Sequence, residues 1–138
     1  MRSSSSASET EALAAELAVS LGAGDVVLLL GEMGAGKTTF VRGACRALGV
    51  TGPVTSPTFT IGRRYDDGRV PVSHLDLHRI ADLDDEDPAL LADYLTPDRV
   101  AFVEWPEVGG AELGRAATWE VRLAHAGEDV REVEVTRR

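Results

Sequence analysis

Lysine, asparagine and glutamine are almost or entirely missing from this chain of 138 residues. Lys37 is the only lysine, every other basic residue is arginine, and asparagine and glutamine do not occur. Cys45 is the only cysteine, which excludes an intrachain disulfide, and we expect it to be a small buried side chain in a helix. The longest purely aliphatic run, residues 26–30, is far shorter than the roughly 20 residues that a membrane-spanning helix needs.

An excess of positive charge is missing too. The formal net charge is -9 and the pI is near 4.7, whereas a protein that grips nucleic acid unaided usually presents a basic face. Any role with RNA or DNA is therefore expected to depend on a partner. The length and a hydrophobic fraction of 43% suit one globular domain. Because Arg2 is followed by four serines and not by an apolar stretch, we expect a cytoplasmic protein.

The single lysine lies in a glycine-rich segment that fits the pattern G-x-x-x-x-G-K-[ST], at residues 31–38. Such a loop surrounds a polyphosphate with backbone N–H groups. The apolar run 26–30 predicts a buried strand before it, and a helix is predicted from about residue 37 to 48. Lys37 would contact the β- and γ-phosphates, and the Thr38 hydroxyl would bind Mg²⁺. The residues predicted to bind the nucleotide are Glu32, Met33, Gly34, Ala35, Gly36, Lys37, Thr38 and Thr39.

Two carboxylates are candidates for the other side of the metal. Glu104 follows the apolar run 100–103, as an acid at the carboxyl edge of a buried strand would, and Asp76 stands near the end of a less apolar run. We predict Thr38 and Glu104 as the metal ligands and Asp76 as a supporting or water-positioning group. Lys37, Asp76 and Glu104 are thus the predicted catalytic residues. The alternative for each acid is a solvated carboxylate at a strand end.

The absence of asparagine and glutamine also narrows the choice of nucleotide. The chain cannot supply an asparagine that recognises guanine, as GTPases do, or a glutamine that orients the attacking water. ATP or ADP with Mg²⁺ is therefore the expected cofactor pair. Ser56 and Thr58 follow the predicted helix, and their hydroxyls either order around a γ-phosphate and metal or belong to a proline turn. A zinc site at His74 and His78 is disfavoured because the local pattern is that of a strand without a third soft ligand.

The remaining pattern indicates strands and short helices in one unit. Residues 8–11 fit a capping box that opens a helix, and residues 1–7 are expected to be disordered. Hairpins are predicted at 59–77, around an Asp-Gly turn, and at 119–135. A short helix is predicted within 90–95, and the acidic residues 82–87 are expected to be a solvated loop or a docking face for a basic partner.

Four segments together resemble the TsaE (YjeE) family of small bacterial P-loop ATPases. They are residues 31–40, Ser56-Pro57-Thr58-Phe59-Thr60, His74-Leu75-Asp76-Leu77 and Val103-Glu104-Trp105-Pro106, and the resemblance runs from about residue 8 to 135. One departure is visible, since the family pattern usually continues Leu-Tyr-Arg after the aspartate and this chain has Leu77-His78-Arg79.

The resemblance implies a Mg²⁺-dependent ATPase that works with the TsaB–TsaD pair in the threonylcarbamoyl modification of tRNA adenosine. TsaD would transfer the group, ATP turnover would reset the complex, and tRNA would be met only through that complex. It also implies that Ser56–Thr60 form a switch-like loop and that Asp76 and Trp105 support the site or couple it to partners. The segment 8–10 and the turn near Gly127 would close over the nucleotide.

We therefore predict an α/β protein with one three-layer α/β/α P-loop NTPase-like domain, residues 8–138, built on a mixed sheet. Two alternatives stay open. A small-molecule or nucleotide kinase would share the phosphate loop but need an arginine-bearing lid, for which Arg63, Arg64 and Arg79 are available. A non-enzymatic module whose interactions are gated by nucleotide would bind ATP without turnover.

Overall fold

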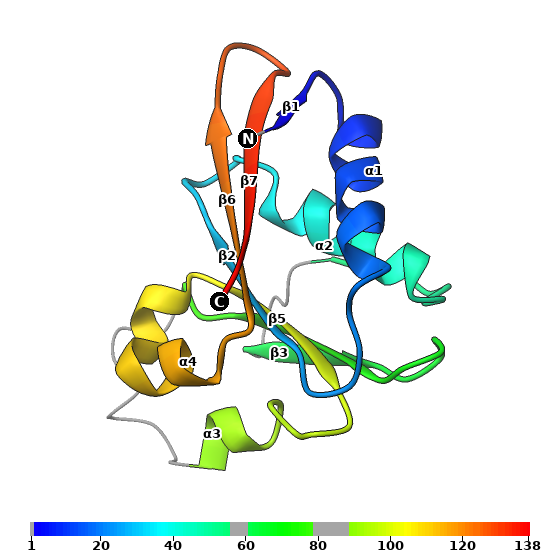
Figure 1. Cartoon of the computed structure of the whole chain (residues 1–138), viewed down its shortest axis with the longest axis vertical. Helices are drawn as coiled ribbons and strands as arrows, with labels where there is room; N and C mark the ends of the chain where they lie inside the picture. Colours follow the sequence, from blue (N-terminus) through cyan, green and yellow to red (C-terminus); the bar gives the residue numbers. More distant parts are fainter. Residues whose placement is uncertain (1, 56–60, 79–88) are drawn as a thin grey trace.

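The computed structural model describes residues 2–55, 61–78 and 89–138, and these form a mixed sheet flanked by helices (Figure 1). The strands are β1 (Arg2–Ser4), β2 (Val26–Leu30), β3 (Gly62–Tyr65), β4 (Val72–Asp76), β5 (Val100–Glu104), β6 (Trp119–His125) and β7 (Arg131–Arg137). The helices are α1 (Ala7–Ala18), α2 (Lys37–Ala47), α3 (Ala89–Ala92), the 3-10 helix η2 (Pro106–Gly109) and α4 (Gly110–Ala116). The order of strands across this part of the chain is β1-β7-β6-β2-β5-β4-β3.

The centre of the sheet is parallel and its two margins are antiparallel. Strand β2 pairs in parallel with β5 and with β6, and β5 pairs in parallel with β4. The hairpins β3–β4 and β6–β7 and the short β1 add antiparallel pairs. Central parallel strands are covered on both faces, which explains why β2 and β5 are continuous apolar runs. The predicted mixed sheet and both predicted hairpins are confirmed in the described residues.

Helices cover both faces of the sheet, so the three-layer α/β prediction is confirmed. Helices α1 and α2 lie on one side, and α3 and α4 lie on the other (Figure 1). Alternate residues of β5 serve the two cores. Val100 and Phe102 pack in the cluster with α1 and α2, while Ala101 and Val103 pack in the cluster that contains Leu113 of α4. Glu104 continues the series of Phe102 and therefore faces α2.

The two helices of the first layer approach each other closely. A Cβ on Gly43 of α2 would stand 2.5 Å from the Cα and from the carbonyl oxygen of Glu11 in α1. Only a residue without a side chain allows this crossing, because real carbon atoms do not approach a backbone so closely. Gly43 thus fixes how closely α1 lies against α2.

The N-terminal segment differs from the prediction of disorder in residues 1–7. Arg2 to Ser4 form β1 on the free edge of β7, with Arg2 opposite Val133. The helix begins at Ala7 and not at the expected capping box at 8–11. Its N-cap is Ser6, whose Oγ accepts the Glu9 N–H at 3.1 Å. The partner strand of β1, which is β7, lies at the other end of the sequence, so the composition of residues 1–7 alone could not predict the pairing.

Smaller differences occur on the second face. The short helix expected within 90–95 is α3, and η2 with α4 were not predicted. Segment 106–116 contains three glycines and α4 buries only Leu113 as a core side chain, so its helical pattern is weak. None of the helices in the described ranges combines the length and hydropathy that a membrane crossing requires.

Candidate functional site

The glycine-rich loop joins the end of β2 to the start of α2. Its first residue, Gly31, has φ 153°, and a Cβ there would lie 2.5 Å from the Leu123 carbonyl oxygen. Gly36 is the N-cap of α2 with φ 103°, a left-handed conformation that favours glycine. The loop therefore passes tightly under β6 and turns directly into the helix. The first amides of α2, which have no intrahelical acceptor, form a binding place for an anion.

Lys37 carries a nearly buried charge, because the residue is only 5% exposed. Its Nζ donates to the Gly31 carbonyl oxygen at 2.5 Å and lies 3.6 Å from the ring centroid of Trp105. Burial lowers the pKa of the ammonium, and the nearby carboxylates of Glu104 and Asp76 oppose that shift. In the described residues no carboxylate pairs with Lys37 within ion-pair distance. A phosphate anion would compensate this buried charge.

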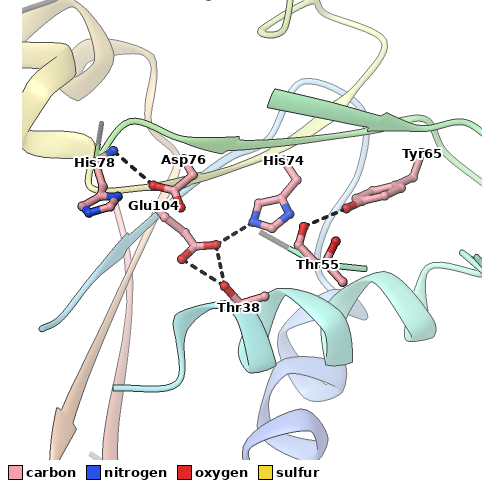
Figure 2. Close-up of polar contacts among 7 residues, drawn as sticks. All are labelled: Thr38, Thr55, Tyr65, His74, Asp76, His78 and Glu104. Atoms are coloured by element: carbon pink, nitrogen blue, oxygen red, sulfur yellow. Dashed lines mark hydrogen bonds and ion pairs between the residues drawn. The ribbon is translucent and has the colours of Figure 1, made fainter. Parts of the chain in front are cut away.

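Thr38 and Glu104 meet as predicted, although they come from different elements. The Thr38 hydroxyl of α2 lies 3.0 Å from Oε2 and 3.2 Å from Oε1 of Glu104, at the end of β5 (Figure 2). Glu104 is only 3% exposed, and its Oε2 also accepts a hydrogen bond from His74 Nε2 at 2.6 Å. A hydroxyl and a carboxylate oxygen in contact are a suitable pair of hard ligands for Mg²⁺.

Asp76 lies beside Glu104 because β4 and β5 are parallel and pair these two residues in register. Its side chain is on the same face of the sheet, is half-buried, and accepts the His78 N–H at 3.1 Å (Figure 2). The structure therefore brings together all three predicted catalytic residues, Lys37, Asp76 and Glu104, at one edge of the sheet. Their chemical roles stay predictions.

Trp105 follows Glu104 in a strained backbone conformation, with φ 57°. A bulky residue at positive φ is uncommon and persists only where the surroundings hold it. Its ring faces the Lys37 ammonium and lies 5.6 Å from the His78 ring. The indole is thus part of the lysine's surroundings, in line with a supporting role. That Trp105 couples the site to a partner stays a prediction.

A cavity of about 380 Å³ lies beside the loop. Three sequence segments line it: Ser5, Ser6, Ala7 and Thr10, then Gly34, Gly36 and Thr39, then Asp129 and Arg131. Arg131 Nη2 also donates to the Gly34 carbonyl oxygen at 3.2 Å. Of the segments expected to close over a nucleotide, Thr10 lines the cavity itself, and Asp129 stands next to the predicted turn near Gly127. Glu32 and Met33 are exposed on the loop, and Ala35 is buried beneath it.

Several predicted residues lie outside the described ranges. These are Ser56, Thr58, Arg79 and the acidic residues 82–87. Within residues 2–55, 61–78 and 89–138, no three His, Cys, Asp or Glu side chains are grouped to hold a metal ion. Of the two disfavoured zinc candidates, His74 is buried and His78 is exposed.

Sequence reasoning missed His74 and Arg131 as residues of the site. His74 stands two residues before Asp76, so both point to the same face of β4. A polar ring at a buried position of a strand, in phase with a predicted site carboxylate, is a signal that could have found it. Nothing local singles out Arg131, which reaches the loop only because β7 lies next to β6 and β6 next to β2.

Comparisons with known proteins point to one family. The family model described as "Threonylcarbamoyl adenosine biosynthesis protein TsaE" matches residues 4–133. The chain is 40% identical over 128 residues to the tRNA threonylcarbamoyladenosine biosynthesis protein TsaE of Bacillus subtilis (strain 168), covering 93% of this chain and 79% of that protein. It is 43% identical over 131 residues to the TsaE protein of Streptomyces coelicolor, covering 90% of this chain and 87% of that protein.

A solved structure extends the likeness to the fold. The crystal structure of Bacillus subtilis YdiB matches with a TM-score of 0.77 and 32% sequence identity, covering 99% of this chain and 83% of that chain. Sequence relatives and the structural neighbour both span most of the residues that build the sheet and the loop. With a family model that covers residues 4–133, these matches establish that the chain belongs to the TsaE family of tRNA threonylcarbamoyladenosine biosynthesis proteins.

Proposed function

We propose that this chain is a Mg²⁺-dependent ATPase that acts with TsaB- and TsaD-like proteins in the threonylcarbamoyl modification of tRNA adenosine. The observation that carries the proposal is the contact between Thr38 and Glu104 at the end of a glycine-rich loop that holds a buried ammonium. Family membership supports the biological process, and the geometry of the loop supports the chemistry.

The residues present fit a nucleotide with its metal. Thr38 and Glu104 would hold Mg²⁺ together with phosphate oxygens, and Lys37 would leave the Gly31 carbonyl to contact the β- and γ-phosphates. Bound Mg²⁺ supplies neutralisation of the charge that develops on the phosphates. The cavity of about 380 Å³ has a volume suited to the nucleoside. Thr39, which lines the same cavity, would contribute its amide to the phosphate site.

We assign to Asp76 the role of positioning the water that attacks the phosphate. Asp76 lies in register with Glu104 on the same face of the sheet, so a water held by it would approach the same phosphate from the side of β4. Among the described residues of β4 and β5, Asp76 and Glu104 are the acids on the face of α2. The formal charge of -9 supports contact with tRNA only through the partner proteins, and we propose the cytoplasm as the location.

Calorimetry of the purified chain with ATP and ADP in Mg²⁺ buffer tests the proposal. We expect micromolar binding by the native chain and at least about a hundredfold weaker binding by Lys37→Ala, because a buried charge-assisted contact is lost. Ser73→Ala is the control, because Ser73 is buried in β4 on the opposite face. If the folded native chain gives no binding heat with either nucleotide, alone or with TsaB and TsaD, the proposal is wrong.

Phosphate release with and without the partners separates the two alternatives. Stimulated ATP hydrolysis with TsaB–TsaD supports the ATPase. ADP formation that depends on an added acceptor, with a phosphorylated product, would support a kinase. Tight ATP binding without turnover, even in the presence of both partners, would support a module that is gated by nucleotide.

A further inference from the structure

We propose that His74 is the positioning residue of the metal site: its imidazole holds the Glu104 carboxylate toward Thr38 and away from Lys37. This inference rests on the proposed Mg²⁺ site. It concerns a residue that touches neither the loop nor, in the proposed arrangement, the metal or nucleotide. His74 would act only through Glu104, the proposed metal ligand that it contacts.

The contact is short and fully enclosed. His74 Nε2 lies 2.6 Å from Glu104 Oε2, and the exposed fractions of the two residues are 0% and 3%. His74 pairs in register with Phe102, two residues before Glu104 on the same face of the neighbouring strand. Backbone pairing of β4 with β5 therefore delivers the ring to the carboxylate. In Figure 2 the ring lies between Glu104 and Tyr65.

The chemistry of the two groups fixes which atom carries the proton. An ionised carboxylate only accepts, so Nε2–H of His74 is the donor. In the described part of the chain, Nδ1 is buried and has no hydrogen-bond partner. The contact is then a charge-assisted hydrogen bond that sets one orientation of the carboxylate.

Two donors on different elements immobilise one flexible acid. A glutamate has several rotatable bonds, and ordering it costs side-chain entropy. Oε2 of Glu104 meets His74 at 2.6 Å and the Thr38 hydroxyl at 3.0 Å. With both contacts made, the carboxylate is already oriented toward the Thr38 hydroxyl before any metal arrives. Such a preset ligand binds its metal without a further loss of freedom.

The same hydrogen bond keeps two opposite charges apart. Glu104 is the carboxylate that acts most strongly on the Lys37 ammonium, yet no ion pair joins the two in the described residues. If Glu104 were released, the Lys37 ammonium would attract it. An ion pair there would occupy both the metal ligand and the phosphate-binding cation. Holding Glu104 on His74 leaves Lys37 available to phosphate.

The ring itself is held from behind. Tyr65 of β3 packs on it with ring centroids 6.3 Å apart and planes 39° apart. The Tyr65 hydroxyl is tied to the Thr55 carbonyl oxygen at 3.5 Å (Figure 2). His74 therefore belongs to a row that runs from β3 through β4 to the end of β5. A ring fixed on both sides transmits its orientation to the carboxylate and does not follow the carboxylate's motion.

The test measures how strongly Mg²⁺ strengthens nucleotide binding. ADP affinity is determined by calorimetry in Mg²⁺ and again in EDTA, and the ratio of the two dissociation constants is the magnesium enhancement. Removing an outer partner of a metal ligand weakens metal binding about tenfold or more. We expect His74→Leu to lower the enhancement about tenfold and to leave the affinity in EDTA within about twofold of the native value.

Conservative variants separate positioning from packing. His74→Gln carries an amide nitrogen near the place of Nε2. It should recover, on a logarithmic scale, at least half of the magnesium enhancement that His74→Leu loses. His74→Asn is too short to reach Glu104 and should behave like His74→Leu, which keeps the test decisive if the leucine variant does not fold. Ser73→Ala is the matched control, because Ser73 is adjacent, equally buried and also without a partner for Oγ in the described residues.

The outcomes are distinct. Native magnesium enhancement in folded His74→Leu or His74→Asn would overturn the role of His74 and leave the proposed ATPase standing. Equal losses in Mg²⁺ and in EDTA would also overturn it, because a merely structural role predicts that pattern. In a Glu104→Gln background, His74→Leu should change the enhancement no further. Absence of any magnesium enhancement in the native chain would overturn both this inference and the proposed metal site.

Discussion

Replacing Gly43 by alanine should destabilise this protein, although alanine favours helices. The added Cβ would stand 2.5 Å from two backbone atoms of Glu11, about 1 Å closer than carbon atoms normally pack. Backbone cannot rotate away as a flexible side chain can, so α1 and α2 must separate along their crossing. Overpacking costs about 1–3 kcal/mol, and a clash with backbone lies in the upper part of that range, at about 2–3 kcal/mol, whereas the better helix propensity of alanine returns about 1 kcal/mol. We expect a net loss of about 1–2 kcal/mol.

A second helical glycine provides the matched control. Gly114 lies in α4, where a Cβ would meet only Arg138 Nη2 at 4.0 Å. Gly114→Ala gains propensity without a clash and should stabilise the fold by about 0.5–1 kcal/mol. For a domain of this size the midpoint of thermal unfolding should fall by about 4–8 °C in Gly43→Ala and rise by about 2–4 °C in Gly114→Ala. Calorimetric melting of the two variants beside the native chain measures both shifts.

The crossing of the helices also reaches the candidate site. Ser6, Ala7 and Thr10 at the start of α1 line the cavity of about 380 Å³, opposite Thr39 of α2. Displacing α1 should therefore weaken nucleotide binding in Gly43→Ala, whereas Gly114→Ala should bind as the native chain does. If Gly43→Ala melts at or above the native temperature, the close approach of α1 and α2 described above is wrong.

Three further predictions test single features. Ser6→Ala should lower the free energy of unfolding by about 1 kcal/mol in urea, whereas Ser8→Ala should not, and the reverse result would restore the cap at residue 8. Burial raises the pKa of the Cys45 thiol from 9.0 to about 12, so between these values only the unfolded chain loses this proton. The free energy of unfolding should therefore fall with rising pH, by up to about 1.4 kcal/mol per pH unit from this group. Denaturation curves measured in parallel between pH 8 and 10.5 should show a shallower decline for Cys45→Ala than for the native chain. Equal slopes would refute the raised pKa of Cys45. Glu104→Ala should reduce partner-stimulated phosphate release about a hundredfold at saturating ATP and weaken ATP binding much less, and native turnover in this variant would remove Glu104 from the proposed metal site.

Prediction from sequence succeeded where the signal is local. The strand–loop–helix order around residues 26–48 follows from an apolar run, fixed glycines and a helical period, all within about 20 residues. The strand that ends at Glu104 and the hairpin around Asp66-Asp67-Gly68 are marked in the same way, by burial patterns and turn residues. The three-layer arrangement then follows, because central parallel strands need cover on both faces.

Prediction failed where the partner lies far along the chain. Residues 2–4 are polar and were expected to be disordered, yet they complete the edge of β7 by backbone hydrogen bonds that any side chain permits. The same limitation hid Arg131, which meets the Gly34 carbonyl across 97 positions of sequence. The periodicity of a single strand does not predict which strands lie next to it in the sheet.

The sequence by itself determined which groups are available: one lysine after a glycine-rich turn, a following threonine, and acids at the ends of buried strands. Only the tertiary structure decided which of them meet. Pairing of β4 with β5 in parallel register sets His74 behind Glu104 and Asp76 beside it, and the packing of α2 on that face brings Thr38 to the same carboxylate. The physical reason is that local patterns specify each element, whereas contacts across elements depend on how all of them bury their apolar faces together.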